Sequence, residues 1–245
     1  MTSTRSSRAE AHGPSGHHHR DVSGGWLRPA VFGAMDGLVT NVSLIAGVGG
    51  TGVHTRFIIL TGLAGLAAGA SSMAAGEFVS VSSQNELVGS EVSKERHELE
   101  NNPDAEQREL AATFRARGVE PALARQVAAQ ISRNPDQALT VHVQEELGVD
   151  PHDLPSPLIA AGASLVTFSL GALVPLLPYL AGATSLLLAL GCAAVAAVLG
   201  GGAVARLTSR PVIRGAARQL LLGAAAAAIT YGIGHAVGVG AGVGG

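Results

Sequence analysis

A run of 52 residues without a single Asp, Glu, Lys or Arg, from 154 to 205, most constrains what this chain can fold into. A second uncharged run occupies 219–245. About 20 consecutive apolar residues in a helix cross the hydrocarbon core of a bilayer, so runs of this length indicate membrane-spanning helices. The lipid bilayer is therefore an expected partner, and no nucleic acid is expected.

Five spans are expected, at about 29–53, 57–80, 156–178, 181–203 and 219–239. Pro175 and Pro178 are expected to form the turn between the third and fourth spans. Residues 1–25 are polar, carry three consecutive histidines at 17–19, and lack the apolar stretch of a cleaved leader. We expect a disordered His-rich head there and a first span that is retained.

Lysine and arginine gather on one side of these spans. They precede the first span, fill the segment between spans two and three, and form an arginine loop between spans four and five; the other side carries only Arg56. By the positive-inside tendency, the amino terminus and the central segment are cytoplasmic and the carboxyl terminus is outside. The arginine loop also suits contact with anionic lipid, and the alanine-rich, lysine-poor composition favours a bacterial plasma membrane.

The central segment is polar, with 14 acidic against 7 basic residues between 84 and 155. Helices are expected at 85–101, continuing out of span two, and at 103–117, 119–133 and 135–148. Asn102 and Asn134 are the expected caps, each followed by a proline. The predicted organisation is a head at 1–25, two spans at 26–84, a cytoplasmic helical metal-binding domain at 85–155, and three spans at 156–245.

An acidic residue within the first span needs an explanation, because a charge at the centre of a membrane helix costs at least about 2.5 kcal/mol. Asp36 lies near the inner third of span one, and Met73 and Glu77 reach a similar depth on one face of span two. Two carboxylates and a thioether at one depth suit a site occupied in turn by a divalent cation and by protons. The alternative is that Asp36 is a protonated packing residue, Met73 a packing residue and Glu77 an interfacial one.

The central segment carries two E-x-x-E pairs, Glu95 with Glu98 and Glu106 with Glu109, on consecutive helices. Residues three apart share a helix face, so four carboxylates can meet across the hairpin. His142 and Glu146 share a face of the last helix with Glu145. Carboxylates with a histidine suit Fe²⁺ or Mn²⁺, whereas a solvated acidic surface is the alternative.

The chain resembles the vacuolar iron transporter family. The resemblance is carried by "GAMDGLVTNVSLIAGVGG" and "AAGASSMAAGEFVSVSSQNEL" in the first two spans, by "ERHELENNPDAEQREL", and by "EELGVDP" before span three. It covers nearly everything from Trp26 to the carboxyl terminus, and it is specific in the first two spans.

This resemblance implies a homodimer of five-span subunits with the transport path at the dimer interface, moving Fe²⁺ and often Mn²⁺ out of the cytoplasm against protons. By position, Asp36 and Met73 look like ligands of the path, with Glu77 beside them. Glu95, Glu98, Glu106, Glu109 and Glu146 look like cytoplasmic ligands. Some members have a methionine pair where this chain has His142 and Val143, so His142 is a candidate replacement ligand and metal selectivity is an open question.

Three functional hypotheses follow. The first is a proton-coupled exporter of divalent metal, in which the cytoplasmic glutamates capture the ion and Asp36 and Met73 carry it through the membrane. The second is a membrane-anchored metal-binding or sensing module without transport, and the third is a passive channel. No nucleophile elbow, phosphate-binding loop or suitable Cys-His pair indicates an enzyme. The metal and the protons are therefore cargo and coupling ions.

Overall fold

The computed structural model describes residues 25–241, and all regular secondary structure in that range is helical. The elements are α1 (Leu27–Gly50), α2 (Thr55–Asn101), α3 (Pro103–Ala116), α4 (Pro121–Ile131), α5 (Pro135–Glu146), α6 (Pro157–Leu173), the 3-10 helix η1 (Val174–Leu176), α7 (Leu177–Leu180), α8 (Leu186–Leu207) and α9 (Val212–Ala241). The expected all-α class is confirmed.

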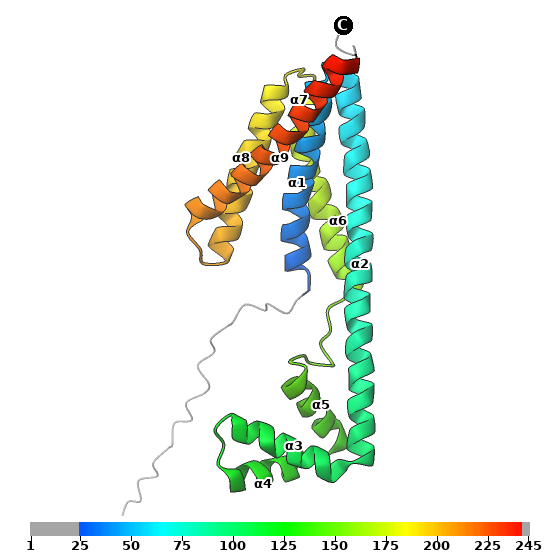
Figure 1. Cartoon of the computed structure of the whole chain (residues 1–245), viewed down its shortest axis with the longest axis vertical. Helices are drawn as coiled ribbons and strands as arrows, with labels where there is room; N and C mark the ends of the chain where they lie inside the picture. Colours follow the sequence, from blue (N-terminus) through cyan, green and yellow to red (C-terminus); the bar gives the residue numbers. More distant parts are fainter. Residues whose placement is uncertain (1–24, 242–245) are drawn as a thin grey trace, which may run out of the picture.

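Five helices are long and apolar enough to cross a bilayer: α1, α2, the continuous unit Pro157–Leu180, α8 and α9. Figure 1 shows them side by side in one bundle, with the chain reversing direction after each. The carboxyl end lies at the end of the bundle opposite to α3, α4 and α5. This arrangement confirms the five expected membrane helices.

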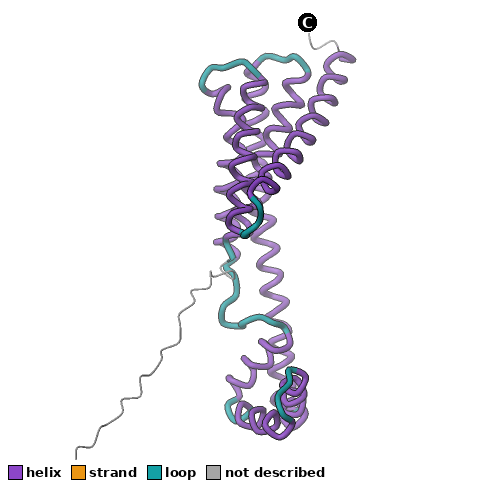
Figure 2. Tube along the Cα trace, turned by 90° about the vertical axis from the view of Figure 1, so that its left-hand side faces the viewer, coloured by secondary structure: helices purple, strands orange, loops and turns teal. Residues whose placement is uncertain are grey.

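The second helix is a single rod of 47 residues, from Thr55 to Asn101, or about 70 Å at 1.5 Å per residue. Its first half belongs to the bundle, and its second half extends away and carries α3, α4 and α5 (Figures 1 and 2). We call residues 85–155 the polar helical region. Asn134 caps α5 as expected, because its Oδ1 accepts from the backbone N–H groups of Asp136 and Gln137. Asn102 is the N-cap residue of α3 and Pro103 begins the helix, as expected, although the Asn102 side chain makes no capping hydrogen bond.

The prediction of a turn at Pro175 and Pro178 was wrong. The two prolines lie within η1 and α7, which continue the line of α6, and the chain reverses only at 181–185. Each proline occupies one of the first positions of a short helix, where the missing N–H has no intrahelical partner to lose. Gly182, at φ +91°, supplies the left-handed conformation that the actual turn requires.

The membrane helices pack backbone against backbone where α1 meets α6. A Cβ on Gly37 would collide with the carbonyl oxygen of Phe168, and one on Gly171 would collide with that of Ala34. The fully buried Asn41 donates from Nδ2 to the carbonyl oxygen of Ala172 at 2.5 Å. Small residues allow this close approach, which drives helix association in lipid.

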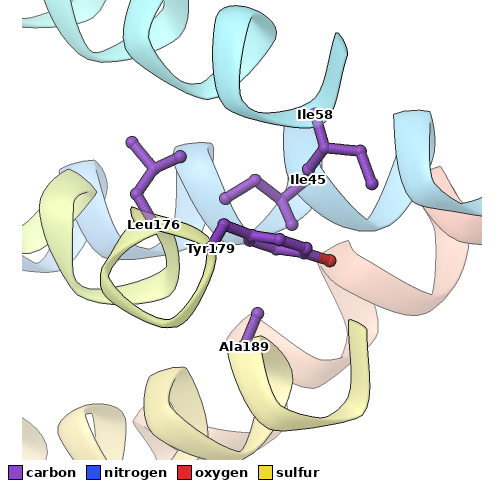
Figure 3. Close-up of a cluster of buried hydrophobic side chains, with 5 residues drawn as sticks. All are labelled: Ile45, Ile58, Leu176, Tyr179 and Ala189. Atoms are coloured by element: carbon purple, nitrogen blue, oxygen red, sulfur yellow. The ribbon is translucent and has the colours of Figure 1, made fainter. Parts of the chain in front are cut away.

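A hydrophobic cluster joins the helices at the end of the bundle far from the polar helical region. It consists of Ile45, Ile58, Leu176, Tyr179 and Ala189, contributed by α1, α2, η1, α7 and α8 (Figure 3). Tyr179 is the largest of them and is 2% exposed. The cluster therefore fixes the short η1–α7 extension against three long helices.

We expect Gly37→Ala to destabilise the protein by about 1–3 kcal/mol, because the new methyl group overpacks a contact made by backbone atoms that cannot move aside. The measurement is thermal unfolding of the purified protein in detergent. Gly162→Ala in α6 is the matched control, since nothing lies within 4 Å of its added Cβ. Equal unfolding temperatures for the two variants would contradict the α1–α6 packing.

Candidate metal centre

Four side chains of the polar helical region converge on one point. Glu95, Glu106, His142 and Glu146 each offer one ligand atom, and these atoms lie within 4.8 Å of one another. The Nδ1 atom of His142 lies 3.0 Å from Oε1 of Glu95, 3.7 Å from Oε2 of Glu106 and 3.6 Å from Oε1 of Glu146. Three carboxylates thus surround one ring nitrogen of a single imidazole.

Three helices bring these residues together. Glu95 lies on the distal part of α2, Glu106 in the first turn of α3 directly after the bend at Asn102, and His142 on α5. Glu146 follows His142 by four residues, so the two share one face of α5. Glu146 is the one exposed member of the four, with 38% of its side chain accessible.

An ion pair holds α3 against α5 beside the cluster. Arg117, at the C-cap of α3, donates from Nη1 to Oε1 of Glu145 at 2.7 Å, and its Nη2 contacts the other carboxylate oxygen. Glu145 directly precedes Glu146 in α5, so this pair helps to fix the register of α5 against α3. No local sequence pattern indicates this ion pair, because 28 residues separate its members.

The carboxylates disturb one another's protonation. Burial, and then the negative charges of Glu146, Glu106, Glu98 and Glu109, raise the pKa of Glu95 from 4.5 to about 7. Burial also raises the pKa of Glu106, with a further rise from Glu109 and an opposing effect of His142. Glu95 lies well beyond the apolar part of α2, whose expected span ends near residue 80. Without a cation, the cluster therefore retains a proton near neutral pH.

Two buried atoms of the cluster lack hydrogen-bond partners. They are Oε1 of Glu95, which lies 3.0 Å from Nδ1 of His142 without the alignment of a hydrogen bond, and Nε2 of His142, whose residue is 1% exposed. Buried polar atoms are nearly always satisfied in proteins, so each such exception calls for a cause. Imidazole and carboxylate donors together suit divalent transition metals such as Fe²⁺ and Mn²⁺.

Two expected ligands stand outside this group. Glu98 and Glu109 are exposed, although both lie close enough for their charges to raise the pKa of Glu95. The structure thus brings together one member of each E-x-x-E pair with His142 and Glu146. The histidines at 17–19 lie outside the described residues.

The expected membrane residues lie apart from this cluster. Asp36 is half-buried on α1 and accepts a hydrogen bond from Oγ1 of Thr40 at 3.3 Å. Within residues 25–241 it has no ion pair with an arginine or lysine. Met73 of α2 packs against the cluster of Ala70, Phe168 and Ala172, and the backbone of Phe168 contacts Gly37 beside Asp36. Asp36 and Met73 therefore both lie near this part of α6, and Glu77 is half-buried one turn beyond Met73.

Asn41 is a membrane residue that the sequence analysis did not single out. It is fully buried on α1, and its Oδ1 has no partner although its Nδ2 bonds to α6. In the sequence, the indication of a buried polar contact was a single asparagine within an apolar run. His235 of α9 is exposed, with its ring stacked on that of Tyr231.

Comparisons with known proteins match most of the chain. The sequence model of the VIT family matches residues 27–235. A vacuolar iron transporter of Acanthamoeba castellanii is 37% identical over 89% of this chain and 82% of its own length. Vacuolar iron transporter 1 of Oryza sativa is 31% identical over 91% of both chains. Vacuolar iron transporter homolog 3 of Arabidopsis thaliana is 36% identical over 87% of this chain and 84% of its own length.

These matches run through all five membrane helices and the polar helical region between them. They agree with the expectation that the protein is not an enzyme. The family resemblance expected from the first two spans and the glutamate pairs is confirmed, and the chain belongs to the VIT family.

Proposed function

We propose that this protein carries divalent metal, Fe²⁺ and also Mn²⁺, out of the cytoplasm in exchange for protons. The observation that carries the proposal is the convergence of Glu95, Glu106, His142 and Glu146 at the far end of a helix that begins inside the membrane bundle. The names of the relatives, vacuolar iron transporters, support Fe²⁺ as the cargo.

The first step is capture by the polar helical region. With three ionised glutamates, the cluster concentrates negative charge that only a cation or protons can neutralise. A divalent ion held by the carboxylates and by Nδ1 of His142 relieves their repulsion. Glu98 and Glu109 are exposed near the cluster and attract cations toward it.

The second step is transfer along α2. Glu77 and Glu95 are 18 residues apart on one uninterrupted helix, which is five turns and about 27 Å. Five whole turns return to the same face, so both carboxylates project on one side of α2. Glu77 is therefore on the same side of the helix as the cluster, with Glu91 between it and Glu95 near that face.

The third step is passage through the bundle at Asp36 and Met73. Asp36 has no fixed cationic partner among the described residues, so a transported metal ion or a proton is free to neutralise it. Met73 adds a soft thioether near the same level of α6, which suits Fe²⁺ better than hard cations such as Mg²⁺. Alternation between metal and proton at Asp36 couples export of metal to entry of protons.

The proposed assembly is a homodimer in a bacterial plasma membrane. Asp36, Met73 and Glu77 all remain partly exposed on the isolated chain, which leaves them available to a path shared with a second copy. The arginine loop between α8 and α9 lies toward the same end of the bundle as the polar helical region (Figure 1). By the positive-inside tendency that end is cytoplasmic, and the carboxyl terminus is outside.

We expect Glu95→Gln to weaken Mn²⁺ binding by at least about 10–100-fold, because the amide supplies no negative charge at the centre of the cluster. Isothermal titration of the full-length protein in detergent measures this. Glu100→Gln is the matched control, since Glu100 is an exposed glutamate of the same helix outside the cluster. Equal losses in the two variants would rule out a specific site.

Metal binding should weaken as the pH falls from about 8 to about 6. Below the raised pKa of Glu95, about 7, its carboxyl group is protonated and must lose that proton to bind the ion. Proton release measured during Mn²⁺ titration should rise over this interval. In Glu95→Gln the part of the release that belongs to Glu95 should vanish, and an unchanged profile would contradict its role.

Asp36→Asn should abolish Fe²⁺ uptake into proteoliposomes while leaving Mn²⁺ binding at the polar helical region unchanged. The amide keeps the side-chain shape and the hydrogen bond from Thr40 but cannot exchange a metal ion for a proton. Uptake is followed with a metal-sensitive dye inside the vesicles, and proton movement with a pH-sensitive dye.

The same assay separates the three hypotheses. Metal uptake coupled to opposite proton movement supports an exporter. Binding without uptake by the unaltered protein would indicate a sensor or tether, and uptake without proton movement would indicate a channel. Full uptake by Asp36→Asn would refute the membrane site.

A further inference from the structure

An apolar cavity of about 730 Å³ lies between α1, α8 and α9. Its volume falls within the range of about 300–1,000 Å³ that is typical of ligand pockets. Four residues of α1, six of α8 and six of α9 line it, and Tyr231 carries the only polar side-chain atom among them. Leu187, 80% exposed, and Tyr231, 43% exposed, lie at its rim, so the cavity opens to the surface of the bundle.

The cavity exists because α9 changes its neighbour along its length. Near its start, Gly215 packs directly against the backbone of Gly201 in α8. Near its end, Gly234 packs against the backbone of Gly47 in α1. Between these contacts α9 crosses the bundle diagonally (Figure 1), and its short side chains, among them Ala224 and Ala228, leave the space open.

The dimensions and chemistry of the cavity fit one hydrocarbon chain. Its α9 wall runs from Leu220 to Tyr231, a stretch of 12 residues that is about 16 Å long. One leaflet contributes about half of the roughly 30 Å hydrocarbon core, a similar length. A polar occupant would lose its hydrogen bonds to water against such walls, whereas an acyl chain loses none.

A group of arginines lies beyond the end of the cavity at which its α9 wall begins. Arg206, Arg210, Arg214 and Arg218 lie on the α8–α9 turn and the adjoining helix ends, all four are exposed, and none forms an ion pair with any residue between 25 and 241. Arg218 precedes Leu220, where the apolar wall begins, by two residues. Guanidinium groups bind phosphate strongly, and each basic residue near a membrane surface favours anionic lipid.

We propose that this cavity holds an acyl chain of an anionic phospholipid whose headgroup binds the arginines of the α8–α9 turn. The lipid fills the space left between these three helices, beside the cluster in which Leu38 and Val42 of α1 pack against Ala193 and Ala197 of α8. This proposal concerns a site apart from Asp36 and the metal cluster, and it stands whether or not the protein exports metal.

The test is photolabelling of the full-length protein in detergent. Phosphatidylglycerol with a diazirine in one acyl chain is compared with the matching phosphatidylcholine, and labelled residues are mapped by mass spectrometry. We expect phosphatidylglycerol to label the lining residues of α1, α8 and α9. Arg214→Gln combined with Arg218→Gln should lower that labelling by about tenfold or more, whereas Arg28→Gln, at the start of α1, should not.

A second pair of variants tests the cavity itself. Ala224→Leu combined with Ala228→Leu fills the space and should abolish labelling of the lining, whereas Ala225→Leu, an exposed position of α9 outside the lining, should not. Thermal unfolding verifies that each variant is folded. Equal labelling by both lipids in every variant would overturn the proposal. So would a disulfide-linked dimer of Ala228→Cys in a Cys192→Ser background, because a second copy would then occupy the cavity.

Discussion

The close approach of α1 to its neighbours governs the membrane part of this protein. Hydrocarbon offers no hydrophobic drive for helix association, so contact area between small residues must supply it. Gly37 meets α6, Gly47 and Gly50 meet α9, and Asn41 and Leu44 lie against Gly65 of α2. The first helix is thus surrounded by three others. A helix held on so many sides can carry a carboxylate such as Asp36 at a fixed depth and orientation.

In the polar helical region the dominant interaction is repulsion between like charges. Its candidate centre is a set of like charges brought together by packing, and the cost is visible in the raised pKa of Glu95 and Glu106 and in two unsatisfied buried atoms. The Arg117–Glu145 pair neutralises a neighbouring carboxylate and ties α3 to α5 without entering the cluster. A cation bound there would offset the repulsion among these carboxylates.

The sequence predicted what composition and spacing determine, and it failed where tertiary packing decides. Uncharged runs predicted the five membrane helices. The spacing of the glutamates predicted that Glu95 and Glu106 belong to an acidic cluster. Spacing alone could not show that Glu98 and Glu109 remain exposed, because residues three apart still differ by about 60° around the axis. Proline was read as a turn at Pro175, although the first position of a short helix accepts it equally well. The cavity beside α9 depends on how three distant helices cross, which no local pattern encodes.

Because α2 is one unbroken helix, the number of residues between two of its side chains sets the angle between them around the helix axis. Each residue of a helix adds about 100° of rotation. One residue inserted between Glu77 and Glu95 would therefore rotate Glu95 by about 100° around the helix axis relative to Glu77. Seven added residues, nearly two turns, would restore the facing to within about 20° while lengthening the rod by about 10 Å. A lengthened α2 that keeps Glu77 and Glu95 on one side must therefore grow by a near-integral number of turns.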